Sequence, residues 1–551
     1  MIVVGIKLTH DGAVAVLDGS RLVISAEVEK QENRPRFSRL HDLGLVDRVL
    51  AGQGIAPGDV DAFVVDGWGS AVTTSRDGLE VTLYTAPYQE LRRQDDSLAS
   101  YEFSGLPVGG RTFGYRSFHH TTGHILSAYC VSPFAHAGEP SFVLVWDGAV
   151  PPRLYHVDPR IAGPPKVASL GPVFGMLGSA YATFATYFPP FRPEDVGDPP
   201  DWRAYHQLSL PGRIMAYTAL GTVRTDLCQV LDEIYAEAST ESFEFVHTLA
   251  KSFLQRTEHL RYEAADAMAS FQHWLGRGML DGLVKVSRAH QADTRNVCLG
   301  GGCALNIKWN AAVRHCGVFD GVFVPPFPND AGAAIGTACG VLVQTGQAAL
   351  DWTVYSGPAL GGARIGSTAA EAYEPRPCTI AELACLLHGT GEPVVLLHGQ
   401  AELGPRALGN RSILAPATEA SMKDRLNSIK GREAYRPVSP ICLEDRAREI
   451  FDPGSPDPYM LFEHAVRPQW TGRIPAVMHL DGSARLQTVT ERQNPVAAEL
   501  LASYERLSGI PVLCNTSANM NGSGFFPDVE SALRWGRCRY VWSDGMLWER
   551  S

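Results

Sequence analysis

The sequence lacks a regular cysteine pattern, a long apolar run and an excess of positive charge. Its 11 cysteines include no CxxC pair, which favours reduced thiols in a cytoplasmic protein over a disulfide framework. No apolar run approaches the ~20 residues that span a bilayer. The opening MIVVGIKLTHDG is interrupted by Lys7 and His10, unlike a signal peptide. The formal net charge of −11 argues against a general nucleic-acid or membrane-surface binder.

The length of the chain indicates more than one domain. At 551 residues it is too long for a single hydrophobic core. Residues 346–377 are rich in Gly, Ala, Thr and Pro and show no clear periodicity, which is typical of a linker. We therefore predict a first domain over 1–350, a linker over 351–377 and a second α/β domain over 378–551.

The first domain opens with a strand pattern typical of actin-like and sugar-kinase-like ATPases. Apolar runs at 2–6, 13–17 and 22–28 predict strands, and Asp18-Gly19 supplies a hairpin turn before the third. In such domains the first loop faces the nucleotide, and here that loop carries His10. A second β-loop-helix pattern near residues 297–336 mirrors the first half and predicts a two-lobed domain. Residues 80–117 are polar and only weakly periodic, and we interpret them as an insertion.

The segment 119–147 offers a candidate metal site. His120 and His124 are four residues apart, so on a helix both imidazoles share one face. An apolar strand nearby ends at Asp147, and another acidic strand end follows at Asp330. These four side chains predict a metal centre, although spacing alone is met more often by two polar residues with no ligand role. A set of two imidazoles and two carboxylates suits iron, zinc or manganese.

Glycines and cations further along the chain suggest sites for phosphate groups. Residues 243–289 predict long helices with apolar stripes, and three glycines at 300–302 then join a strand to a helix. Glycines there let backbone N–H groups approach a phosphate, although tight turns use the same residues. In the second domain GQAELGPRALGNRS is followed by a basic stretch over 423–436. A phosphate pocket explains this cluster better than a solvated helical face does.

Six stretches together resemble one known family. They are KLTHDGAVAVLDG, LGGGCALN, PPFPNDAGAAIG, GQAELGPRALGNRSILA with MKDRLNSIKGREAYRPVSP, HLDGSARLQTV and PVLCNTSANMNG. On these motifs the chain resembles the NodU/CmcH family of O-carbamoyltransferases, which includes the tobramycin, nodulation-factor and cephalosporin enzymes. The opening is most similar to the cephalosporin branch. Gln400, Ala401 and Arg213 depart from the usual family residues without removing a proposed ligand.

The resemblance implies a fold and a two-step reaction. The first domain would be actin-like and two-lobed, and the second, smaller domain would be a YrdC-like α/β fold. Carbamoyl phosphate and ATP, with Mg²⁺, would give carbamoyl adenylate and pyrophosphate in the second domain. The first domain would then transfer the carbamoyl group to a hydroxyl of a small natural product.

The resemblance also implies residue roles. His10 would sit beside the acceptor as general base, and a divalent metal, iron in this family, would lie at His120, His124, Asp147 and Asp330. The adenylate would contact Gly301, Gly302, Asn306 and Asp330. Carbamoyl phosphate would be bound by Arg406, Lys430, Arg436, Arg485, Asn515 and Ser517, with Arg406 and Lys430 taking part in activation.

Partners and alternatives follow from the same reasoning. We expect a small-molecule hydroxyl acceptor, no nucleic acid, no membrane and a cytoplasmic location, with a homodimer left open. The acceptor could be a cephem, macrolide, aminoglycoside or sugar-bearing polyketide. Two other functions share the domain types: a tRNA threonylcarbamoyl-modifying enzyme and a non-catalytic actin-like nucleotide-binding protein. The acidic net charge disfavours the first, and the cationic second domain disfavours the second.

Overall fold

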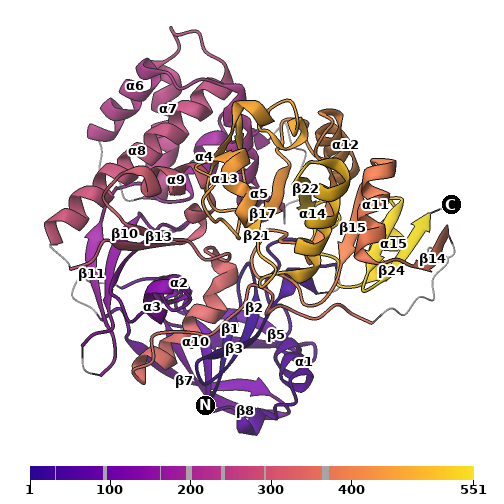
Figure 1. The fold of residues 1–551 in the computed structure, drawn as a ribbon. Helices are drawn as coiled ribbons and strands as arrows, with labels where there is room; N and C mark the ends of the chain where they lie inside the picture. The colour runs from indigo at the N-terminus through magenta and orange to yellow at the C-terminus, as the bar shows by residue number, and fades with distance from the viewer. Residues whose placement is uncertain are drawn as a thin grey trace. The chain divides into compact units, whose positions relative to one another are not determined.

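The chain forms two compact units (Figure 1). The computed structural model describes residues 1–31, 33–90, 96–161, 163–193, 202–237, 242–290, 293–362 and 372–550. One unit comprises Met1–Ser25 and Phe37–Thr353, and the other comprises Ala26–Arg36 and Val354–Ser551. The short segment Ala26–Arg36 thus belongs to the second unit, whereas the sequence suggested one uninterrupted first domain over 1–350. Of the predicted linker 351–377, residues 363–371 lie outside the described residues.

The first unit contains two sheets that share one strand order. In the first sheet β3, β2, β1, β4 and β8 are neighbours in that order, with β7 beyond β8. In the second sheet the corresponding order is β11, β10, β9, β12 and β13. In the first sheet the middle strand β1 pairs antiparallel with β2 and parallel with β4. In the second sheet β9 pairs in the same way with β10 and β12. The mirrored halves expected from the sequence are therefore present as two similar sheets.

The three strands predicted at 2–6, 13–17 and 22–28 are confirmed, and their bounds differ from the prediction by at most one residue. In the first sheet the strands are β1 (Ile2–Lys7), β2 (Ala13–Asp18), β3 (Arg21–Glu27), β4 (Ala62–Asp66), β7 (Ser100–Val108) and β8 (Arg111–Phe118). In the second they are β9 (Ser141–Val145), β10 (Arg153–Asp158), β11 (Lys166–Pro172), β12 (Asn296–Gly300) and β13 (Gly321–Phe323). A separate hairpin is formed by β5 (Ala71–Arg76) and β6 (Leu79–Tyr84).

Helices complete the first unit. They are α1 (Gly44–Gly52), α2 (His120–Tyr129), α3 (Pro133–His136), α4 (Ala180–Ala185), α5 (Trp202–Tyr217), α6 (Thr225–Ala236), α7 (Phe243–Arg256), α8 (Ala264–His290), α9 (Ile307–His315) and α10 (Ala333–Gln344). The two long helices α7 and α8 confirm the helices predicted over 243–289. No helix in the described ranges is long and apolar enough to cross a bilayer.

The interpretation of residues 80–117 as an insertion was wrong for its second half. There β7 and β8 form an antiparallel hairpin, and β8 pairs in parallel with β4 inside the first sheet. Residues 91–95 of this stretch lie outside the described residues. Most of β7 and the start of β8 are exposed or half-buried, so their polar composition hides the apolar alternation that identifies a strand.

Two glycines allow α10 to pack closely, one against α2 and the other against β1. A Cβ on Gly336 of α10 would lie 1.8 Å from the carbonyl oxygen of Gly123 in α2. A Cβ on Gly5 of β1 would likewise lie 2.0 Å from the carbonyl oxygen of Ala334. Because α2 carries both histidines and α10 directly follows Asp330, this packing places the predicted ligands next to one another.

Replacing Gly336 by alanine is expected to destabilise the first unit. The new Cβ would overlap backbone atoms that cannot move without separating the helices, at a cost of about 1–3 kcal/mol or more. Thermal unfolding would show a lower midpoint for the transition of this unit. Gly52→Ala is the matched control, since its Cβ would meet no atom within 4 Å and should be neutral or slightly stabilising. Equal midpoints for the two variants would contradict the packing argument.

The second unit is built on an eight-stranded mixed sheet, which confirms the α/β class of this part. Its strands run in the order β14, β24, β23, β15, β16, β22, β17 and β21. Their bounds are β14 (Tyr373–Pro377), β15 (Val394–Leu397), β16 (Arg411–Pro416), β17 (Ser439–Leu443), β21 (Gln487–Val489), β22 (Val512–Ser517), β23 (Tyr540–Ser543) and β24 (Met546–Arg550). Three short strands form a second sheet: β18 (Phe451–Asp452), β19 (His464–Val466) and β20 (Ser483–Ala484).

Helices pack on this sheet to enclose one apolar core. They are α11 (Ile380–Thr390), α12 (Ser421–Lys430), α13 (Glu444–Ile450), α14 (Pro495–Ser508) and α15 (Val529–Trp535). The core includes fully buried Leu383 and Leu387 of α11, Leu396 of β15 and Leu500 of α14.

Candidate functional site

Four predicted ligands of the first unit meet in one buried cluster. Ligand atoms of His120, His124, Asp147 and Asp330 all lie within 4.8 Å of one another. The two Nε2 atoms of the histidines are 3.1 Å apart. Asp330 Oδ1 lies 3.4 and 3.5 Å from them, and Asp147 Oδ2 lies 3.9 and 3.8 Å from them.

These distances fit a single metal ion. Ligand atoms roughly 2.0–2.2 Å from an ion of coordination number four to six lie roughly 3.0–3.5 Å from one another. In addition, two nitrogen atoms facing each other at 3.1 Å are poorly satisfied without a cation or proton between them. The Nδ1 atom of His124 is buried and has no hydrogen-bond partner among the described residues. The residues present therefore fit a divalent ion with mixed nitrogen and oxygen ligands.

Groups around the cluster hold its ligands in place. Asp66 Oδ2 lies 2.7 Å from Nδ1 of His120, so that the Nε2 atom faces the cluster. The Tyr88 hydroxyl donates to Asp147 Oδ2 at 2.5 Å, and the Gly302 N–H donates to Asp147 Oδ1 at 2.8 Å. Asp66 and Tyr88 were not predicted. Asp66 ends the apolar strand β4, and Asp147 comes just after the apolar strand β9. A carboxylate at the end of an apolar strand is the signal that could have found Asp66.

A buried lysine, also not predicted, lies beside the cluster. Lys7 Nζ is 2.9 Å from Asp330 Oδ2 and 3.2 Å from Asp66 Oδ2. It ends β1, next to β4, which ends at Asp66. The carboxyl ends of parallel strands meet at one edge of a sheet, and ligands of open α/β sheets bind there.

Proton binding at the cluster follows from its charges. Burial opposes a charge on His120, but the carboxylates of Asp66 and Asp330 outweigh burial and raise the pKa of His120 to about 9. Below that pH the metal-free site holds a proton that a metal ion must displace.

We therefore expect the affinity for Mn²⁺ or Zn²⁺ to rise about tenfold per pH unit between pH 6 and 8, because one proton is released. Competition with a chelator of known pH dependence measures this slope. Asp66→Asn removes a carboxylate that keeps His120 protonated, so its slope should flatten at the upper end of the range. An affinity of the wild-type protein that does not change with pH would contradict the assignment.

His10 lies at the more accessible side of the cluster. Its Nδ1 atom is 2.9 Å from Asp11 Oδ2, and its Nε2 atom is 3.6 Å from Asp330 Oδ2. The side chain is 29% exposed, whereas those of His120 and His124 are fully buried. Burial opposes a charge on His10, yet Asp330 and Asp11 together raise its pKa. His10 lies beside the cluster, and its predicted place beside the acceptor, as general base, stays a prediction.

The predicted adenylate contacts have structural roles of their own. Gly301 has φ of +85°, and a Cβ there would lie 2.3 Å from the carbonyl oxygen of Trp146. The side-chain oxygen of Asn306 caps α9 by accepting from the N–H groups of Lys308 and Trp309. Their contacts with a nucleotide stay predictions.

The second unit brings together several cations. Arg406, Arg436 and Arg485 were all predicted from the sequence. They lie close enough to one another, and to Arg36 and Arg432, for the charges of the group to repel. Burial, and then repulsion by the other guanidinium groups, lowers the pKa of Arg485 to about 10 and that of Arg432 to about 9. The same two causes place the pKa of Arg406 well below its usual value.

Arg406 is the member of this group that most requires an anion. Its Nε atom is buried and has no hydrogen-bond partner among the described residues. A buried, unpaired cation surrounded by like charges is costly, so a phosphate bound here would relieve desolvation and repulsion together. Arg36 was not identified as a site residue in the sequence, because no local pattern links it to a motif 370 residues later.

Lys430, Asn515 and Ser517 lie in the same unit but have partners within the chain. Lys430 Nζ donates to the carbonyl oxygens of Ser517 and Asn519, each at 2.7 Å, and also contacts Asn519 Oδ1. Asn515 donates to the Ala407 carbonyl and to Gln487, while its Oδ1 atom is buried without a partner among the described residues. Lys430 thus holds the 517–519 loop, and its predicted contact with carbamoyl phosphate stays a prediction.

The loop that carries Arg406 is held by two buried carboxylates. Glu402 Oε1 accepts from the N–H groups of Leu408, Asn410 and Arg411 at 2.7, 2.8 and 3.0 Å. Glu27 Oε1 accepts from the Gly404 N–H and from Lys30, both at 2.8 Å. These bonds explain why Glu402 lies within the glycine-rich motif and why the segment Ala26–Arg36 belongs to this unit.

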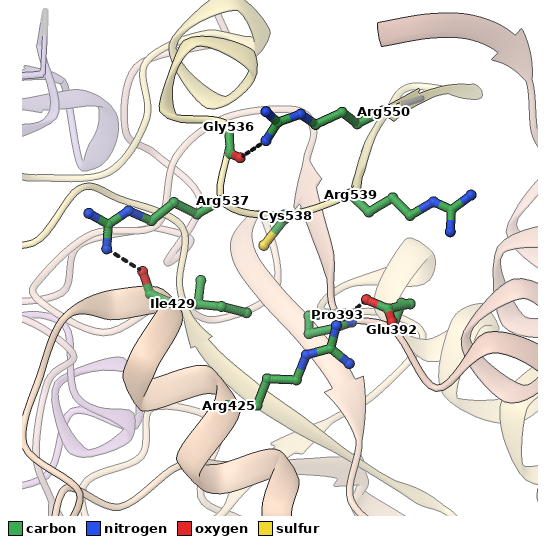
Figure 2. Close-up of a pocket in the computed structure, with 9 residues that line it drawn as sticks. All are labelled: Glu392, Pro393, Arg425, Ile429, Gly536, Arg537, Cys538, Arg539 and Arg550. Atoms are coloured by element: carbon green, nitrogen blue, oxygen red, sulfur yellow. Dashed lines mark hydrogen bonds and ion pairs between the residues drawn. The ribbon is translucent and has the colours of Figure 1, made fainter. Parts of the chain in front are cut away.

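A separate pocket of about 220 Å³ in the second unit is lined by arginines but does not resemble a phosphate site (Figure 2). Arg537 and Arg539 point away from each other and from the centre of the pocket. Arg425 pairs with Glu392, Arg537 donates to the Ile429 carbonyl, and Arg550 donates to the Gly536 carbonyl. The guanidinium groups therefore already have partners and do not converge.

Fold and site together define an α/β protein with a buried cluster of histidines and carboxylates in one unit and a group of buried arginines in the other. The family description "Carbamoyltransferase N-terminus" matches residues 2–339, and "Carbamoyltransferase C-terminus" matches residues 386–540. The chain belongs to the carbamoyltransferase family and is an enzyme of that class, as the sequence motifs predicted.

Curated relatives match over the whole chain. Nodulation protein U of Rhizobium tropici is 46% identical, and the alignment covers 100% of this chain and 96% of that protein. The 3'-hydroxymethylcephem-O-carbamoyltransferase of Streptomyces clavuligerus is 32% identical, with 98% and 97% covered. Among solved structures, a ROK family glucokinase from Streptomyces griseus matches with 14% identity and a TM-score of 0.28 over 62% of this chain and 98% of that one. The whole chain thus has higher identity to the nodulation protein than to the cephem enzyme, unlike the branch suggested by its opening.

Proposed function

We propose that this protein is an ATP-dependent O-carbamoyltransferase that works in two steps. In the second unit, water would cleave carbamoyl phosphate to carbamate and phosphate. A carbamate oxygen would then attack the α-phosphorus of Mg²⁺-bound ATP, giving carbamoyl adenylate and releasing pyrophosphate. In the first unit, a hydroxyl of the acceptor would attack the carbamoyl carbon, and AMP would leave.

The cations of the second unit support the first step. Carbamate and ATP are both anions, so attack of a carbamate oxygen on the α-phosphorus brings two negatively charged groups together. Cations nearby lower the cost of that approach. Arg406, with its unpaired Nε atom, is the group best placed to bind a phosphate, and Arg436 and Arg485 add positive charge nearby. Asn515 Oδ1 offers an unused acceptor for an N–H group, as the carbamoyl nitrogen would require.

The observation that carries the second step is the position of His10 beside the buried cluster. Asp11 at Nδ1 leaves the Nε2 atom of His10 to accept the proton of the acceptor hydroxyl. The four ligands His120, His124, Asp147 and Asp330 would hold a divalent ion, which we propose to be Fe²⁺. When bound, such an ion supplies a Lewis acid for the carbonyl or phosphate oxygen.

The arrangement of the sheets supports the finer fold assignments. Two sheets with one strand order in a single unit are what an actin-like, two-lobed domain requires. We propose that the adenylate lies against Gly301, Gly302, Asn306 and Asp330, at the strand ends of this domain, and that the second unit is a YrdC-like domain. The acceptor would be a small molecule with a free hydroxyl. The cephem alcohol named for one relative is a reasonable first compound to test.

Pyrophosphate release tests the first step without knowledge of the acceptor. The protein is incubated with Mg²⁺, ATP and carbamoyl phosphate, and each substrate is omitted in turn. We expect pyrophosphate release only when both substrates are present, and we expect it without any added RNA. Release that requires tRNA would favour a tRNA-modifying enzyme, and no release at all would favour a nucleotide-binding protein without this chemistry.

A further inference from the structure

Lys7 is a charged side chain buried within the first unit. It is 1% exposed, although it ends a strand and reaches no solvent. Its Nζ atom contacts three oxygen atoms: Thr9 Oγ1 at 2.6 Å, Asp330 Oδ2 at 2.9 Å and Asp66 Oδ2 at 3.2 Å. The ring of Trp68 covers it, with the ring centroid 3.9 Å away. A cation this enclosed needs a specific reason to be there.

The charges around the cluster supply that reason. The carboxylates of Asp11, Asp66, Asp147 and Asp330 surround the histidines, and Lys7 is the permanent cation in contact with two of them. One divalent ion in the cluster, together with Lys7, would nearly balance these carboxylates. Without Lys7 the same site would carry one further uncompensated negative charge and would leave a space lined by oxygen atoms.

Asp330 links the two cation positions. Its Oδ1 atom faces the two histidines, and its Oδ2 atom faces Lys7. A carboxylate that directs one oxygen to each of two neighbouring cations is the arrangement found between paired metal ions. The oxygen atoms around Lys7 are also the ligand type that Mg²⁺ and Mn²⁺ prefer.

We propose that the Lys7 ammonium group replaces a second metal ion and limits the centre to one divalent cation. Lys7 occupies Asp330 Oδ2, so Asp330 offers only Oδ1 to the ion between the histidines. It also supplies a fixed charge that cannot exchange with ions from solution. This inference rests on the metal centre of the proposed function and concerns how many ions that centre accepts.

Metal stoichiometry of the full-length chain tests the proposal with Mn²⁺ as the probe. Calorimetry gives the number of ions bound per chain, and electron paramagnetic resonance distinguishes an isolated Mn²⁺ from a spin-coupled pair. We expect one isolated ion in the wild type and two coupled ions in Lys7→Ala, where the space and the oxygen ligands are freed. Lys7→Met is the matched control: it removes the charge but fills the space, so it should bind one ion.

The outcomes distinguish the role of Lys7 from the existence of the metal centre. One ion in both wild type and Lys7→Ala, or two in the wild type, would overturn the role of Lys7 and leave the metal centre intact. No ion in the wild type would instead contradict the metal centre itself. If Lys7→Ala does not fold in metal-free buffer, it is refolded with Mn²⁺. Recovery of a two-ion protein supports the proposal, and failure to recover while Lys7→Met folds contradicts it.

Discussion

Replacing Arg406 by methionine should lower the rate of pyrophosphate release from ATP and carbamoyl phosphate by roughly 10²–10³-fold or more, the usual cost of one preorganised charged donor. The guanidinium of Arg406 is buried among like charges, and its Nε atom is unpaired among the described residues. Its interaction with a phosphate would therefore be strong, and water could not take the place of the guanidinium as a donor. Methionine keeps the apolar stem and removes only the charge and the donors.

Two further variants locate the effect. Arg406→Lys retains the charge but loses the planar fork, so it should remain well below the wild type. Arg539→Met removes an arginine of the same unit whose partner is Glu549 at its surface, and it should behave as the wild type. If Arg406→Met released pyrophosphate at the rate of Arg539→Met, the phosphate site would have to lie elsewhere.

Replacing His10 by alanine should reduce carbamoyl transfer by about 10²–10⁴-fold, the range typical of a lost general base. Pyrophosphate release in the absence of acceptor should stay near the wild-type rate, because His10 belongs to the first unit and activation is assigned to the second. Transfer is followed by mass spectrometry as the gain of one carbamoyl group on an alcohol, with the cephem alcohol tested first. His136→Ala, at a half-exposed histidine of the same unit, is the control.

The pH profile adds a readout that a structural role would not produce. A base works in its unprotonated form, and Asp330 and Asp11 raise the pKa of His10 against the effect of burial. The transfer rate should therefore rise with pH up to that raised pKa. Asp11→Asn removes one of these carboxylates, so its acid limb should move to lower pH. Loss of both half-reactions together in His10→Ala would show that the assigned role is wrong.

The four residues proposed as metal ligands could be grouped from the sequence because they follow simple local rules. His120 and His124 have helical spacing, and Asp147 and Asp330 follow predicted strands; the structure brings all four together. Lys7 and Asp66 follow the same rule of strand ends but were not identified. Charged residues at strand ends are common, and only the parallel pairing of β1 with β4 shows that these two lie side by side.

Other features depend on contacts between distant parts of the chain. Arg36 and Arg406 are brought together because the Gly404 N–H donates to Glu27 and Lys30 donates to the Gly404 carbonyl oxygen, contacts that no local pattern indicates. The residue type of Lys430 suggested a phosphate contact. In the folded chain its three donors bind Ser517 and Asn519, partners that composition does not indicate, and the phosphate contact stays a prediction. The hairpin formed by β7 and β8 was hidden because its exposed faces are polar.

The most direct test of the two-step reaction is its stoichiometry in a single turnover with labelled ATP and carbamoyl phosphate. For each carbamoylated acceptor we predict one AMP, one pyrophosphate and one phosphate, with carbamoyl adenylate formed before the acceptor is consumed. Carbamoylation that proceeds equally well without ATP, or that yields ADP in place of AMP, would contradict activation through an adenylate.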